Sequence, residues 1–297
     1  MITHLSYFEK LAKKTTRKKL VVAAAEDENV LKAVNECYQN KFVNPILFGN
    51  TIKIKFLLNK LHIQDYNIEI VDVSSPEEAA YKAVEYIRNN PDSILMKGLV
   101  KSNILLKEII KKDTGLLTGK LLSHVGLIES PYYHKILGIT DGAININPNL
   151  QHKIEIIKNA IIFFNNLGYQ QPKVAVLGAI EKKNEKIEST VHAAEIKNYF
   201  VKNNIKNCII DGPLALDNAI SESAAKSKKI KSEVAGDADI LVAPNIDAGN
   251  ILYKSLNFLG GSTTAGVIIG GSSPVVFTSR ADSHKTKYMS VILACIQ

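Results

Sequence analysis

The stretch IEIVDVSSPEEAAYKAVEYIRNNPDSILMKG, residues 68–98, indicates the fold of this chain. It opens with an apolar strand candidate (IEIVDV), continues with a helical pattern over Pro76–Asn89, and closes with a second strand candidate (SILMKG). Ser75 and Pro76 are typical of a helix cap and a first helical turn. Strand, helix and strand in this order form the unit from which parallel sheets with covering helices are built.

The same alternation continues along the rest of the chain. Further strand candidates are KLVVAAA (19–25), PILFG (45–49), HVGLIE (124–129), KVAVLGA (173–179), NCIIDG (207–212), ADILVAP (238–244), AGVIIGG (265–271) and PVVFTS (274–279). Helical patterns also cover Asn29–Gln39 and Leu150–Leu167. We therefore predict an α/β fold in which helices lie on both faces of parallel strands.

About ten strands exceed what one ordinary open sheet holds, so we predict two three-layer α/β domains. The first comprises residues 1–147 and 271–297, and the second is an insertion of residues 148–270. The breaks fall near NINPN (145–149) and GGSS (270–273). The cleft between two such domains is where a ligand is expected.

The composition predicts a globular cytoplasmic protein without a membrane partner. Hydrophobic residues make up 46% of the 297 residues, yet no apolar run reaches the roughly 18 residues that span a bilayer. The first residues lack the apolar centre of a signal peptide. Cys37, Cys208 and Cys295 stand far apart without neighbouring histidines, so we expect buried reduced thiols rather than metal ligands.

The net charge of +8 is interpreted as a solvated face or as a general attraction for a small polyanionic ligand, in preference to nucleic-acid binding. Lysines cluster only at 13–19 and 226–231, and no aromatic residues are interleaved with them as a stacking platform would require. Common catalytic motifs are also missing from the sequence. GLLTGKLL (115–122) imitates a phosphate-binding loop with the wrong spacing, and GxGxxG after a strand, HExxH and GxSxG do not occur.

Polar residues instead follow several strand candidates, where a parallel sheet offers its binding crevice. These residues are Lys97, Gly98, Ser102, Asp141, Asn145, Asp247, Gly249 and Asn250. The backbone N–H groups at the start of a helix near Asp247 could receive phosphate. Each residue also has a structural explanation: Asp247 and Ser102 as helix caps, the glycines as turn formers, and Lys97 as a surface charge.

The stretch TSRADS (278–283) separates the last strand candidate from a final helix. Arg280 offers a planar fork that fits a phosphate, and Ser279 offers a hydroxyl that could donate to an oxyanion. Asp282 has two interpretations, a general base or the N-cap of the helix that begins near Ser283.

The sequence from Asp211 to Leu256, followed by GVIIGGSSPVVFTSRADS, resembles the phosphate acetyl/butyryl transferases. The likeness extends upstream through VAVLGAIEKKNEKIESTVHAAEIK, LGITDGAININPNLQHKIEIIKNAI and LLTGKLLSHVGLIE to LMKGLVKS. The chain length, the MKG block and the SRADS ending are more similar to the butyryltransferase branch.

This resemblance implies exchange of an acyl-CoA and phosphate with an acyl phosphate and CoA. It implies a two-domain fold like that of isocitrate and isopropylmalate dehydrogenases, with the site in the cleft, and a homo-oligomer. Coenzyme A would be a substrate, and neither a bound cofactor nor a metal would be needed. Ser279 matches the family serine that stabilises the transition state, Arg280 matches the phosphate-binding arginine, and Ser123 falls in a block expected to bind substrate.

The sequence departs from the family at the base that deprotonates the CoA thiol. The acetyltransferases carry an aspartate six residues after the arginine, where this chain has Thr286. Asp282, His284, or the positive field of Lys97, Arg280 and helix N-termini without a dedicated base remain as alternatives. Other readings of the whole chain are an acetyl-specific transferase, a dehydrogenase of the related fold, and a non-catalytic binding protein that kept the fold.

Overall fold

The computed structural model describes residues 1–64 and 68–297. Two compact units emerge, one formed by Met1–Leu5 with Ser123–Thr264 (unit 1) and one by Ser6–Leu122 with Ala265–Gln297 (unit 2). These units divide the chain after residues 5, 122 and 264, whereas the sequence predicted domain boundaries after residues 147 and 270. The two-domain division and its ligand cleft stay predictions.

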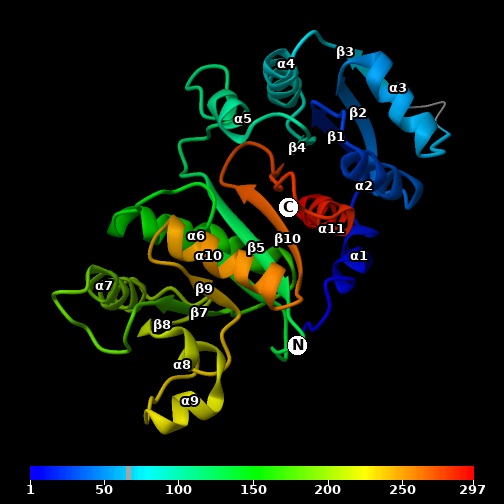
Figure 1. Cartoon of the computed structure of the whole chain (residues 1–297). Coiled ribbons are helices and arrows are strands. Elements are labelled where there is room, and N and C mark those ends of the chain that lie inside the picture. Colours follow the sequence, from blue (N-terminus) through cyan, green and yellow to red (C-terminus); the bar gives the residue numbers. More distant parts are fainter. Residues whose placement is uncertain (65–67) are drawn as a thin grey trace. The chain divides into compact units, whose positions relative to one another are not determined.

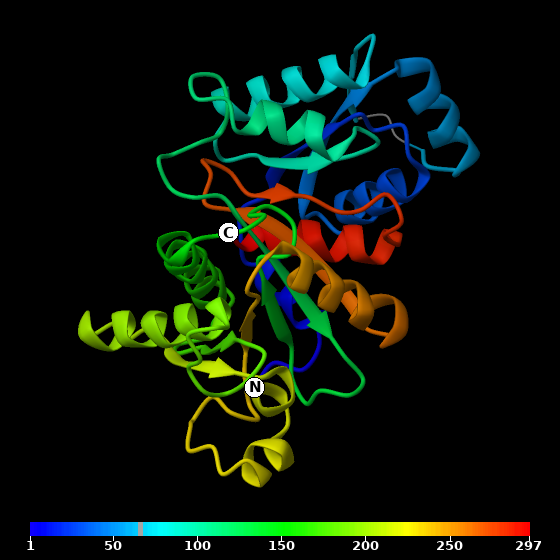
Figure 2. The same ribbon diagram turned by 60° about the vertical axis from the view of Figure 1, so that its left-hand side comes forward.

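Unit 2 contains strands in the order β3-β2-β1-β4-β11-β10. The strands are β1 (Lys18–Ala23), β2 (Val43–Gly49), β3 (Glu69–Asp72), β4 (Ile94–Lys97), β10 (Thr263–Ile269) and β11 (Val275–Val276). The helices are α1 (Tyr7–Ala12), α2 (Glu28–Gln39), α3 (Thr51–Lys60), α4 (Pro76–Asn89), α5 (Ser102–Ile109) and α11 (His284–Ile296). Helices α4 and α5 lie on one face of the strands, and α2 and α11 lie on the other (Figure 1, Figure 2).

The opening strand–helix–strand stretch folds as predicted. Helix α4 spans Pro76–Asn89, its N-cap Ser75 accepts a hydrogen bond from the backbone N–H of Glu78, and Pro76 occupies the first turn. Strands β1, β2, β3 and β4 run parallel, as do β4 and β11. The alternation of strand and helix therefore predicted this part of the fold correctly.

Unit 1 contains strands in the order β5-β6-β9-β7-β8. The strands are β5 (Ser123–Glu129), β6 (Leu137–Thr140), β7 (Lys173–Leu177), β8 (Ile209–Leu214) and β9 (Ile240–Val242). The helices are α6 (Leu150–Asn166), α7 (Glu188–Lys202), α8 (Leu216–Ile220), α9 (Glu222–Ser227), α10 (Ile246–Lys254) and the π-helical turn η1 (Ser255–Leu259).

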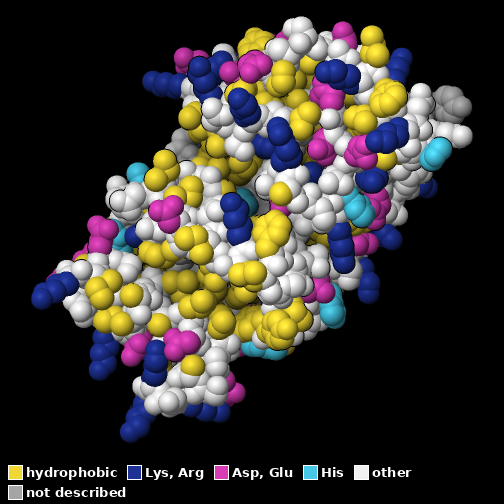
Figure 3. Space-filling view, viewed as in Figure 1, with side chains coloured by type: hydrophobic (Ala, Val, Ile, Leu, Met, Phe, Trp, Pro, Cys, Tyr) yellow, Lys and Arg dark blue, Asp and Glu magenta, His cyan; other side chains and the backbone are white. Residues whose placement is uncertain are grey.

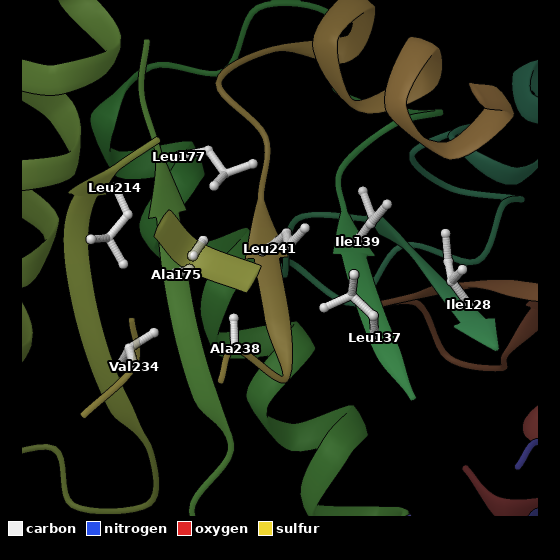
Figure 4. Packing of buried hydrophobic residues seen from close by; sticks show 10 residues of the cluster. Ile128, Leu137, Ile139, Ala175, Leu177, Leu214, Val234, Ala238 and Leu241 are labelled. Atoms are coloured by element: carbon white, nitrogen blue, oxygen red, sulfur yellow. The ribbon is translucent and has the colours of Figure 1, made fainter. Parts of the chain in front are cut away.

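The core of unit 1 lies on both faces of these strands. Ile139, Ala175 and Leu241 pack on one face with Ala219 of α8, as Figure 4 shows for the labelled strand residues. Gly138 turns to the opposite face, where a Cβ would stand 2.6 Å from the ring of Phe164 in α6. Helices therefore cover both faces of the strands, in agreement with the α/β prediction.

The prediction of parallel strands is wrong for two pairs. Strand β10 pairs with β11 antiparallel, and β5 pairs with β6 antiparallel. Both connections are far shorter than the dozen or more residues that a parallel crossover needs, so only a hairpin can join these strands. The sheet structure is mixed, and β6, which was not among the ten clearest strand candidates, is part of it.

Two further findings concern the composition. Cys37, Cys208 and Cys295 are free and buried, as the sequence predicted. None of the helices in the described part of the chain is long and apolar enough to cross a membrane.

Candidate active site

The strand order of unit 2 reverses between β1 and β4, because β2 and β3 lie on one side of β1 and β4 lies on the other. Ligands of open α/β sheets bind at the carboxyl ends of strands beside such a reversal. Here the loop after β1 leads through Asp27, the N-cap of α2, and the loop after β4 begins at Gly98. Residues on these two loops are therefore the first candidates for a site.

At Gly98 the backbone of the loop after β4 lies in close contact with the backbone at the end of β1. Its N–H donates to the carbonyl of Ala23 at 2.9 Å, and the N–H of Leu99 donates to the carbonyl of Ala24 at 2.6 Å. A Cβ on Gly98 would stand 2.1 Å from the Ala24 carbonyl oxygen and 2.7 Å from that of Ala23. Because both neighbours are backbone atoms, only glycine fits at this position.

Lys97, the last residue of β4, carries a buried ammonium group and is not the surface charge that the structural explanation assumed. Its Nζ lies 6.0 Å from the ring centre of Phe277. Burial lowers the pKa of Lys97, and Lys287 and Arg280 lower it further, whereas Asp27 and Asp282 raise it. Four charged groups thus act on Lys97, and we call Asp27, Lys97, Arg280, Asp282 and Lys287 the charged cluster.

The segment Thr278–Ser283, the Ser279 loop, is held by two members of this cluster. The carboxylate of Asp282 accepts a hydrogen bond from the backbone N–H of Ser279 at 2.7 Å. Lys287 Nζ donates to the carbonyl oxygens of Ser279 at 2.8 Å and Asp282 at 3.0 Å. The side chains of Asp282 and Lys287 are buried, while Ser279 and Arg280 are exposed.

The interpretation of Asp282 as the N-cap of the last helix is wrong. Ser283 is the N-cap of α11, and its hydroxyl accepts from the N–H of Thr286 at 3.2 Å. The Asp282 carboxylate instead turns back to the Ser279 N–H. His284, the first residue of α11, is half exposed. Its Nε2 lies 3.7 Å from Oε2 of Glu36 in α2.

Lys287 and Asp27 are members of the cluster that sequence reasoning missed. Lys287 is 2% exposed although it stands in the second turn of a helix whose sequence there, HKTKY, reads as polar. Burial lowers its pKa, and the carboxylates of Asp282 and Asp27 oppose that shift. No local pattern marks a buried lysine, because its burial depends on the loops that cover it.

Asp141 follows β6 in unit 1, and its carboxylate is fully engaged by the protein. It accepts from the N–H groups of Ala143 at 2.8 Å, Ile144 at 3.0 Å and His124 at 3.1 Å, and from the side chain of Asn145 at 2.7 Å. This buried carboxylate therefore shapes the loop after β6 and binds four groups of its own chain.

Gly249 and Asn250 hold helix α10 against the same loop. A Cβ on Gly249 would lie 2.6 Å from the Asp141 carbonyl oxygen, and the Asn250 side chain donates to the Gly142 carbonyl at 3.0 Å. Asn245, rather than Asp247, is the N-cap of α10, accepting from Ala248. Asp247 lies exposed in the first turn.

Ser123 stands at the start of β5 with no exposed surface. Its hydroxyl accepts a hydrogen bond from the side chain of Asn159 in α6 at 3.0 Å. Ser102 is the first residue of α5 and Lys101 is its N-cap, so Ser102 is not the cap that the structural explanation proposed.

The predicted residues form one group in each unit. The group in unit 2 lies at the end of β4 and on the loops after β4 and β11, and comprises Lys97, Gly98, Ser279, Arg280 and Asp282. The group in unit 1 lies on the loop after β6 and on α10 and comprises Asp141, Gly249 and Asn250.

Two surface features complete the description. No three His, Cys, Asp or Glu side chains among residues 1–64 and 68–297 are grouped so that they could hold a metal ion. On the face that Figure 3 shows, Lys and Arg side chains are interspersed with Asp and Glu and form no continuous stripe.

Known proteins are similar to this chain over most of its length. A family model described as "Phosphate acetyl/butaryl transferase" matches residues 5–88 and 75–295. The phosphate butyryltransferase of Clostridium acetobutylicum is 42% identical over 94% of this chain and 93% of its own length. The phosphate acetyltransferase of Thermotoga maritima is 43% identical over 94% of this chain and 95% of its own length.

Among solved structures, a branched-chain phosphotransacylase from Enterococcus faecalis V583 has a similar fold. The two structures agree with a TM-score of 0.82 at 34% identity, covering 94% of this chain and 98% of the other.

Proposed function

Because the chain belongs to the phosphate acetyl/butyryl transferase family, we propose that it interconverts a short-chain acyl-CoA and phosphate with an acyl phosphate and CoA. A phosphate oxygen attacks the thioester carbonyl carbon, so that a C–O bond forms and the C–S bond breaks. Sulfur leaves as a thiolate and takes up the proton that hydrogen phosphate loses when its oxygen is acylated. The reverse reaction needs a thiolate nucleophile and a leaving phosphate.

The observation that carries this proposal is the charged cluster beside Ser279. Lys287 and Arg280 both act on the buried Lys97, Lys287 Nζ donates to the Ser279 carbonyl at 2.8 Å, and Arg280 is exposed next to Ser279. A phosphate dianion would relieve their mutual repulsion, and the planar Arg280 fork can hold two of its oxygens. The exposed Ser279 hydroxyl would donate to the oxyanion of the tetrahedral intermediate.

The residues of unit 1 receive positioning roles in this proposal. Asp141, Gly249 and Asn250 fix the loop after β6, and Ser123 fixes the start of β5, so they would shape the substrate-binding surface instead of contacting substrate. Asp247 is exposed and remains the member of this group that a substrate could contact directly.

Butyryl-CoA is the acyl donor that we propose. The SRADS ending resembles the butyryltransferase branch, but the butyryl and acetyl relatives are equally similar to the whole chain, at 42% and 43% identity. One methylene changes the binding free energy in an apolar pocket by about 1 to 3 kcal/mol, so acyl-CoAs of several short chain lengths would be used.

We also propose a cytoplasmic homo-oligomer. The three free buried thiols fit a reducing compartment.

The function is tested by incubating the protein with phosphate and acetyl-, propionyl- or butyryl-CoA and measuring release of the CoA thiol. We expect phosphate-dependent release that is fastest with butyryl-CoA. Release that is fastest with acetyl-CoA would replace the butyryl proposal by the acetyl one. Absence of phosphate-dependent release with all three donors would refute the transferase proposal.

For the thiol proton we propose that no dedicated base is needed at Asp282. Its carboxylate already accepts the Ser279 N–H, whereas the positive field of Lys97, Arg280 and helix N-termini would stabilise a thiolate. Asp282→Asn keeps an oxygen that can accept the Ser279 N–H. We therefore expect kcat in the direction that consumes CoA to fall less than about tenfold, because a lost general base costs about 10²- to 10⁴-fold.

Asp282→Ala is the matched variant, since it also removes the hydrogen-bond acceptor, and we expect it to lower kcat more than Asp282→Asn. The measurement is steady-state kcat at saturating CoA and acyl phosphate. If Asp282→Asn lowers kcat by more than about 100-fold, Asp282 is the base and the proposal is wrong.

A further inference from the structure

The buried ammonium group of Lys287 is the least expected member of the charged cluster. An ammonium group loses hydration on burial, and an apolar side chain of similar length is often tolerated better at such a place. Lys287 is nevertheless 2% exposed and directs its Nζ to two backbone carbonyls, those of Ser279 and Asp282. Packing of α11 alone would not require this charge.

The two carbonyls belong to the Ser279 loop, and one of them is the carbonyl of Ser279 itself. On the other side of the same residue, the Ser279 N–H is bound by the Asp282 carboxylate at 2.7 Å. The peptide groups before and after Ser279 are thus both held by buried side chains. Because both flanking peptide groups are fixed, the direction in which the exposed Ser279 side chain leaves the backbone is fixed as well.

We propose that Lys287 is a positioning residue for the transfer reaction, acting through Ser279. It holds the Ser279 carbonyl while Asp282 holds the Ser279 N–H, and together they keep the Ser279 hydroxyl aimed at the oxyanion. Misplacement of a catalytic donor by about 1 Å can cost about 100-fold in rate, so such a support has a measurable effect. The inference rests on the proposed transferase function.

The first experiment is a double-mutant cycle of Lys287→Met and Ser279→Ala, read as kcat and KM in the thiol-release assay. We expect Lys287→Met to lower kcat about 10- to 100-fold in the wild-type background, with KM for acyl-CoA changing less than about threefold. In the Ser279→Ala background, where no hydroxyl remains to be aimed, we expect less than about threefold further loss.

Lys285→Met is the matched control, because Lys285 is exposed two residues before Lys287 in α11 and its loss removes an equal charge. We expect it to leave kcat within about twofold of wild type. If Lys287→Met lowers kcat by the same factor with and without Ser279, the lysine acts independently of the serine and the inference is wrong.

A second measurement does not depend on activity. Amide hydrogen exchange of peptides that cover the Ser279 loop should become faster in Lys287→Met than in Lys285→Met, because the loop loses two of its hydrogen bonds. Unchanged exchange would overturn the inference even if the protein showed no transferase activity, whereas inactivity of the wild type alone would count against the proposed function.

Discussion

Replacement of Ser279 by alanine is expected to lower kcat about 10²- to 10³-fold, the loss seen when one oxyanion donor is removed. Ser279 is exposed, and its hydroxyl accepts a long hydrogen bond from the Ala281 N–H at 3.4 Å. Folding should therefore be almost unaffected, with the free energy of unfolding changing by less than about 0.5 kcal/mol. Steady-state kinetics and urea unfolding of the same preparation separate the two effects.

Arg280→Ala provides the contrast for this prediction. Arg280 is proposed to hold phosphate in both the ground and the transition state, so its loss should raise KM for phosphate more than it lowers kcat. Ser279→Ala should do the reverse. A rise in KM for phosphate without a change in kcat in Ser279→Ala would remove the serine from the oxyanion role.

Replacement of Gly98 by alanine is expected to destabilise the protein by about 3 kcal/mol or more, a loss large enough to need a specific structural cause. The added Cβ would stand 2.1 Å from the Ala24 carbonyl oxygen and 2.7 Å from that of Ala23, and neither oxygen can swing aside as a side chain could. Relief requires β1 and β4 to separate beside Lys97, so activity should fall together with stability. Urea unfolding measured by circular dichroism tests the first effect.

Gly119→Ala is the control for the same chemical change. Gly119 has φ +85° and no atom within 4 Å of its added Cβ, so the substitution meets backbone strain but no clash. We expect it to cost about 1 kcal/mol. Equal losses in the two variants would mean that steric contact at Gly98 is not what makes glycine necessary there.

The sequence predicted the strands and helices well because each carries its own local signal. Ser75 and Pro76 mark the start of α4, and alternating apolar runs mark the ten strand candidates, each of which overlaps an observed strand. Strand direction was predicted less well because apolar periodicity is the same in parallel and antiparallel strands. The short connection between β10 and β11 was the available signal for a hairpin.

The site was predicted only in part for a related reason. Ser279 and Arg280 could be chosen as candidates because their chemistry is visible in a short exposed stretch. The hydrogen-bond partners of Asp282 and Lys287 depend on how that stretch folds back on itself. The N-cap of α11 is Ser283 and not Asp282, a difference of one residue that the sequence does not settle. Asp141 followed a strand as a ligand-binding residue would, but its carboxylate accepts from three groups of the next four residues and from the His124 N–H of β5.

The way in which the Ser279 loop is anchored has an evolutionary consequence. Its supports come from Asp282 and Lys287, three and eight residues downstream of Ser279. Ser279 and the two side chains that hold its peptide groups are therefore encoded within one continuous segment, 278–287, that a single recombination event could exchange between relatives. Such a segment can be inherited or lost as a unit. In a relative that keeps the serine, we expect the residues equivalent to Asp282 and Lys287 to be kept together.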